Sequence, residues 1–178
     1  MSQYYYFTAS LPMLEPEGPP PFDLEEFLDS CARLLTASDF EEIQRARLNA
    51  PSAGQTRIEL LRRFQDAECG LRNELVKLRA KKLGVEPDRY IREESLNPLL
   101  AAAAREILEQ ETPLKAESFM SGILWTILED LTVGHQFDVD FLTGYYLKLQ
   151  ILERRASFQV EAGKQKLESI LSGDKLDG

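Results

Sequence analysis

The sequence predicts an all-α fold: an elongated bundle of about six helices, two of them very long, preceded by an extended N-terminal segment. Apolar residues recur every three or four positions through most of the chain, which is the helical period. A proline-free helix from Asp138 to Leu171 would be roughly 50 Å long. We therefore expect this last helix to kink near Gly163 or to protrude from the bundle. Its predicted buried stripe is Phe141, Tyr145, Leu149, Leu152, Ala156, Val160, Gly163, Leu167 and Ile170.

Residues 1–22 are predicted to be an extended N-terminal segment followed by a proline-rich connector. Over residues 4–11, four consecutive aromatic residues are followed by small ones, and this composition, rich in strand formers, favours an extended chain. Three consecutive prolines, at positions 19–21, then exclude both helix and sheet. The aromatic side chains of this segment suit either a half-exposed interface or docking onto the protein's own helices, and both interpretations stay open. These residues are Tyr4, Tyr5, Tyr6 and Phe7.

Residues 23–178 are predicted to form one helical domain, with two possible helical units, 23–84 and 96–171. Capping signals mark the ends of its helices. Ser, Thr, Asp and Asn suit the position before a helix, proline suits its first position, and glycine suits the position after its last. The predicted starts are Asp23, Ser38, Thr56, Asn97-Pro98, Thr112-Pro113 and Asp138, and the predicted ends include Gly84 and Gly134.

Two cysteines and the single tryptophan are predicted to lie in the core. Cys31 and Cys69 fall on apolar helical faces, and one histidine in the whole chain leaves no zinc-ligand spacing. Both cysteines are therefore expected to pack as small hydrophobic residues. Trp125 lies beside the apolar face of its predicted helix and is also expected to be buried.

The charge balance excludes several classes of partner. The chain carries 30 acidic and 21 basic residues, a net charge of -9, which opposes binding to nucleic acid or to an anionic membrane surface. No window approaches the ~18 apolar residues of a membrane span, and the N-terminus lacks the features of a secretory signal. We expect a cytoplasmic protein that binds no nucleic acid and does not itself span a membrane.

One cluster, around His135, is a candidate for metal binding or acid–base chemistry. Asp138 and Asp140 follow it closely, and Glu129 and Asp130 precede it. A hard cation needs about six oxygen ligands, more than this loop offers. Asp138 is better explained as a helix cap and Asp140 as a first-turn carboxylate that the helix dipole stabilises. We therefore predict no catalytic residue, metal or cofactor, and keep a metal-dependent helical hydrolase as the weakest alternative.

The run from Glu68 to Gly84, ECGLRNELVKLRAKKLG, resembles the helix that ends each repeated unit in the C subunits of V/A-type ATPases. The pattern of that family leads from an acidic residue through Asn73 to Arg79-x-Lys81 and glycine. The opening Tyr-Tyr-Tyr-Phe and the chain length resemble more closely a short family of uncharacterised proteins associated with bacterial V-type ATPase subunits. Where the C subunits repeat Asn and Arg-x-Lys in their last unit, this chain has Gly-Lys-Gln-Lys from position 163.

The C subunit is an all-helical connector between the central stalk and the membrane rotor ring, and the resemblance implies that role here. The predicted function is a non-catalytic connector or accessory subunit of a V-type ATPase or ATP synthase, in ion or proton transport. Its partners would be other subunits of that complex, at the cytoplasmic face of the inner membrane. A free-standing helical adaptor, or a homodimer paired through the terminal helix, is the main alternative. The candidate interface residues are Asn73, Arg79, Lys81, Glu153, Arg154 and Arg155.

Overall fold

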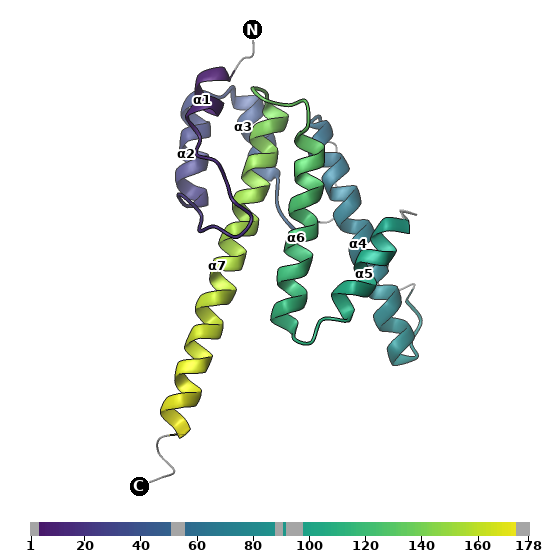
Figure 1. Cartoon of the computed structure of the whole chain (residues 1–178). Helices are drawn as coiled ribbons and strands as arrows, with labels where there is room; N and C mark the ends of the chain where they lie inside the picture. The colour runs from purple at the N-terminus through teal and green to yellow at the C-terminus, as the bar shows by residue number, and fades with distance from the viewer. Residues whose placement is uncertain (1–3, 51–55, 88–90, 92–97, 174–178) are drawn as a thin grey trace.

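The computed structural model of the chain describes residues 4–50, 56–87, 91 and 98–173, with side chains only as far as residue 158. Over these ranges the chain forms seven α-helices and no strand, which confirms the all-α class (Figure 1). None of these helices is both long and apolar enough to cross a membrane. The helices are α1 (Tyr5–Ser10), α2 (Leu24–Leu34), α3 (Ala37–Arg45), α4 (Glu59–Leu83), α5 (Pro98–Leu108), α6 (Pro113–Thr132) and α7 (Val139–Gly173).

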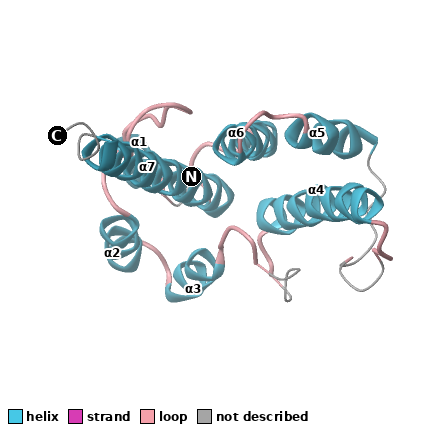
Figure 2. Ribbon diagram, turned by 90° about the horizontal axis from the view of Figure 1, so that it is seen from below, coloured by secondary structure: helices cyan, strands magenta, loops and turns pink. Residues whose placement is uncertain are grey.

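The helices pack in two layers. Figure 2 shows α7, α6 and α5 in one row and α2, α3 and α4 in a second row. Helix α6 packs against α7 and α5, and α4 packs against α5, α6 and α7. Figure 1 shows that the C-terminal half of α7 continues past the other helices. The N-terminal half of α7 therefore lies within the bundle, and the core extends from it through α6 and α4 to α5.

The N-terminal half of α7 is buried on more than one side. Leu142 and Leu147 are both 0 % exposed although they lie five positions apart, on different sides of the helix. The single stripe that the sequence predicts is thus only part of the buried surface. Of that stripe, Tyr145, Leu149 and Leu152 are buried and Phe141 and Ala156 are half-buried, while Val160, Gly163, Leu167 and Ile170 lie outside the described side chains.

Phe27 of α2 is the centre of an aromatic cluster that joins the N-terminal helices to α7. Its ring centroid lies 5.5 Å from those of Tyr145 and Tyr146 and 6.1 Å from that of Phe7. Aromatic side chains bury large apolar areas, so this cluster fixes α1 and α2 beside α7. The predicted core residues Cys31 and Trp125 are also buried, and Cys69 is half-buried.

Helix α1 lies in the segment that the sequence predicts to be extended, so that prediction is wrong. The Tyr4 hydroxyl donates a hydrogen bond to the Asp39 carboxylate, and both Tyr4 and Phe7 are buried. Tyr5 and Tyr6 are instead 51 % and 88 % exposed. Docking of two aromatic side chains onto the bundle outweighs the strand propensity of the segment. The aromatic cluster at the N-terminus is therefore partly core and partly surface.

Local capping signals place most helix ends correctly. The predicted start at Ser38 is wrong, because Thr36 is the residue that caps α3. Helix α4 begins at Glu59 rather than Thr56, because the Thr56 hydroxyl bonds to a carboxylate of α3. The predicted start at Asn97 lies outside the described residues. The confirmed caps are Asp23, Thr112, Asp138 and Gly84.

Replacing Tyr4 by Phe removes the hydroxyl that binds Asp39 and keeps the buried ring. We expect the free energy of unfolding to fall by about 1–2 kcal/mol, because a buried carboxylate loses a hydrogen bond. Urea denaturation followed by circular dichroism measures this change. Tyr6→Phe is the matched control, since Tyr6 is 88 % exposed, and it should leave stability unchanged. Equal losses in the two variants would contradict the role given to the Tyr4 hydroxyl.

Candidate functional site

Two carboxylates of α7 cap the N-termini of other helices. Asp140 Oδ1 accepts a hydrogen bond from the backbone N–H of Leu60, in the first turn of α4, at 3.1 Å. Glu153 Oε1 accepts one from the N–H of Leu24, the first residue of α2, at 2.8 Å. The first N–H groups of a helix lack partners within it, and a negative charge there also interacts favourably with the helix dipole. Helix α7 therefore binds the first turns of both α2 and α4.

Gln150 of α7 holds the start of the connection between α3 and α4. Its side-chain amide accepts a hydrogen bond from the N–H of Leu48 at 3.1 Å and donates one to the carbonyl of Ala46 at 2.9 Å. The next N–H, of Asn49, bonds to both carboxylate oxygens of Glu68 in α4, each at 3.0 Å. Two helices thus satisfy the backbone of one loop.

Glu68, the first residue of the pattern that resembles the C subunits, is a buried carboxylate. It is 2 % exposed, and its burial raises the pKa of the carboxyl group. The Arg72 guanidinium, 3.3 Å away, and the Asn49 N–H act in the opposite direction. Asn73, the second residue of the pattern, is 4 % exposed. The acidic and amide positions of the pattern therefore face the interior of the protein.

Most of the predicted interface residues contact their own chain. Arg154 forms an ion pair with Glu117 of α6, and Arg155 binds Glu17 of the N-terminal connector at 3.1 Å. Glu153 caps α2, and Asn73 is buried. These residues join elements of the fold. The remaining predicted residues, Arg79 and Lys81, are exposed on the last turns of α4.

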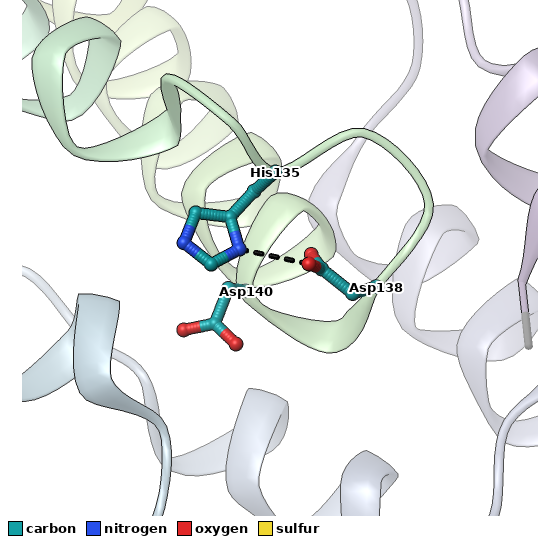
Figure 3. Close-up of side chains that lie close together, drawn as sticks. All are labelled: His135, Asp138 and Asp140. Carbon is teal, nitrogen blue, oxygen red and sulfur yellow. Dashed lines mark hydrogen bonds and ion pairs between the residues drawn. The ribbon is translucent and has the colours of Figure 1, made fainter. Parts of the chain in front are cut away.

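His135, Asp138 and Asp140 lie close together at the start of α7 (Figure 3). Their potential ligand atoms are all within 4.8 Å of one another, the one such group among the described residues. His135 Nδ1 lies 2.8 Å from Oδ2 of the Asp138 carboxylate. The other oxygen of that carboxylate, Oδ1, accepts a hydrogen bond from the N–H of Phe141. Asp140 is bonded to the N-terminal turn of α4. Two helix dipoles point their positive ends at these groups, which disfavours a cation, and we interpret the cluster as a paired helix cap.

A groove of about 930 Å³ runs along α6 and is bordered by α5, by Arg63 and Ala67 of α4 and by the N-terminal connector. Apolar side chains of α6 and α5 form much of its surface, and Leu99 at its edge is 79 % exposed. Arg155 and the connector residue Glu17 also line it. Sequence reasoning missed this groove, because the periodicity of α6 alone does not tell which of its apolar residues a neighbouring helix covers. The α6 residues that line it are Lys115, Ser118, Phe119, Gly122, Ile123, Thr126, Ile127, Asp130 and Leu131.

Comparison with known proteins finds no relative of this chain. No family model, no curated protein and no solved structure matches this chain. The resemblance of residues 68–84 to the C subunits of V/A-type ATPases therefore stays a prediction.

Replacing Asp140 by Ala removes the cap of α4. We expect the free energy of unfolding to fall by about 1–2 kcal/mol, the usual effect of losing a helix cap. Asp29→Ala, at an exposed position of α2, is the matched control and should change stability by at most about 0.5 kcal/mol. Urea denaturation compares the two variants. If Asp140→Ala proved as mild as the control, the cap would contribute nothing.

The buried Glu68 carboxylate predicts a particular pH dependence. Because its pKa is raised in the folded state, the native protein binds this proton more readily than the unfolded chain does. The stability of the wild type relative to Glu68→Gln should therefore be highest below the ordinary carboxyl pKa and fall as the pH rises through the raised one. Urea denaturation of both proteins at a series of acidic to neutral pH values measures the difference. A difference that grows with pH would mean that Arg72 and the Asn49 N–H outweigh burial.

Proposed function

We propose that this protein is a non-catalytic helical connector, an accessory subunit of a V-type ATPase or ATP synthase. In this role an elongated bundle built on α4 and α7 would link the central stalk to the membrane rotor, at the cytoplasmic face of the inner membrane. The proposal takes its partner from the resemblance of residues 68–84 to the C subunits of such complexes. The observation that carries it is the division of α7 into an anchored half and a half that continues past the bundle (Figure 1).

An anchored helix that leaves its bundle suits a connector mechanically. Side chains at positions 140, 150 and 153 bind the backbone of three other segments, so the N-terminal half of α7 is held against rotation and sliding. The helix then continues to Gly173, roughly 25 Å beyond Ser157 at the usual rise. A partner that binds this outer half would be placed at a defined distance and direction from the bundle.

The end of α4 offers a second contact surface of suitable chemistry. Arg79, Lys81 and Lys82 are exposed on its last turns, although the chain as a whole has a net charge of -9. A shallow cavity of about 430 Å³ there is lined by three basic residues, Lys81, Lys82 and Arg105, one acidic residue, Glu109, and the apolar Leu78 and Leu108. Such a surface fits an acidic partner, and the charges would set the orientation of docking more than its affinity.

The polar groups that a hydrolase would use have structural partners here. Asp138, Asp140 and Glu68 each accept backbone N–H bonds, and His135 is bound to Asp138. A general acid or base must reach a substrate proton, and a carboxylate that caps a helix would have to release that helix first. These bonds favour a scaffold over the hydrolase alternative.

Affinity purification from the native cells tests the connector proposal. At low salt and in mild detergent, the tagged protein should recover V-type ATPase subunits, identified by mass spectrometry. An Arg79→Glu/Lys81→Glu variant should recover less of them and keep its melting temperature, because both side chains are exposed. Arg33→Glu, which changes an exposed charge on α2, is the control and should behave as the wild type. Recovery of no ATPase subunit by the wild type would contradict the proposal.

A further inference from the structure

We propose that the groove along α6 is the interface of a symmetric homodimer, in which the α6 helices of two copies lie antiparallel and cross at Gly122. This surface is distinct from the outer half of α7 and from the basic end of α4. The inference concerns the purified protein alone and does not depend on the ATPase proposal.

The face of α6 that lines the groove is apolar and incompletely covered. Phe119, Ile123 and Ile127 pack against the core on one side, yet each stays half-buried and contributes to the groove. Leu99 of α5, at the edge, is 79 % exposed. A continuous apolar groove with a polar rim is typical of a surface that binds another protein.

When two copies of α6 lie antiparallel, the charges on this face of one copy meet opposite charges on the other. Lys115 and Asp130 are both exposed and both line the groove, at opposite ends. The midpoint between them falls beside Gly122. In an antiparallel pair that crosses there, each Lys115 would face the Asp130 of the other copy, giving two ion pairs related by the symmetry axis. A two-fold interface requires such self-complementarity, which a surface for an unrelated helix does not.

Two small residues of α6 are also placed symmetrically about the proposed crossing point. Ser118 and Thr126 lie four positions on either side of Gly122, and both are exposed in the groove. In the antiparallel pair, Ser118 of one copy would meet Thr126 of the other. Small side chains at a crossing allow two helix axes to come close, since the interaxial distance depends on the side chains in contact.

Within the described structure, no neighbouring atom requires position 122 to be glycine. A Cβ atom added there would meet no heavy atom within 4 Å. Glycine inside a helix lowers helix stability by about 1 kcal/mol relative to alanine. Because the fold of one copy does not require glycine at position 122, a contact with a second copy would explain it. A second α6 crossing at this point would use that space.

The ion pairs already present do not oppose this arrangement. Lys115 contacts Glu111, one turn earlier in the chain, but the two side chains are 59 % and 79 % exposed. Exposed pairs of this kind contribute little to stability, so Lys115 is available to a second carboxylate. Arg63 of α4 also lines the groove and is exposed.

Sedimentation velocity over the micromolar range tests the dimer and its axis. The wild type should show a concentration-dependent monomer–dimer equilibrium. Lys115→Asp and Asp130→Lys each place like charges opposite one another and should each weaken the dimer by about tenfold. The double variant restores opposite charges in both pairs and should return to within about threefold of the wild type. Gly122→Leu fills the crossing point and should be monomeric.

Controls separate interface effects from misfolding. Gly122→Leu should melt no earlier than the dilute wild type, because the space above Gly122 is open in one copy. Lys82→Asp, a charge reversal at the exposed end of α4, should leave the dimer unchanged. A wild type that stays monomeric throughout the range would overturn the inference. So would a dimer that tolerates Gly122→Leu, or a double variant no tighter than the single ones.

Discussion

Helix α7 carries three polar side chains, Asp140, Gln150 and Glu153, whose partners are backbone groups of other elements. The N-terminal half of α7 is buried, so polar side chains there must find partners within the protein. Each binds the backbone near the start of another helix or in the loop that precedes one, where N–H groups are otherwise unsatisfied. Because all three sit on one rigid helix, their spacing fixes the relative positions of α2, the α3–α4 loop and α4.

The binding of polar side chains to backbone groups also limits which side chains are available for function. The carboxylates of Asp138, Asp140 and Glu68 bind backbone N–H groups, and among the described side chains the accessible surfaces are the basic end of α4 and the apolar groove of α6. Surfaces of this kind suit a protein that joins others. Charge complementarity at the α4 end and apolar burial at α6 would recognise different partners, so one chain has room for self-association and for binding a larger complex.

Sequence signals predicted those features that depend on neighbouring residues. Asp23, Thr112 and Asp138 cap the helices that follow them, and Gly84 ends α4 in the left-handed conformation with a φ of 68°. The caps supplied by Asp140 and Glu153 were out of reach, since their partners lie 80 and 129 positions away. The local pattern identifies Asp140 only as a first-turn carboxylate and Glu153 only as a candidate interface residue. Helix α1 and the α6 groove were missed for the same reason, because both depend on tertiary packing.

Amide hydrogen exchange tests most directly whether α7 organises the fold. The N–H groups of Leu24, Leu48 and Leu60 lie at helix starts or in a loop, positions that ordinarily exchange quickly through local fraying. If the side chains of α7 hold them, these amides should exchange as slowly as those of the buried helix interiors, at a rate set by global unfolding. Exchange as fast as that of the exposed helix ends would contradict a fold built on these bonds.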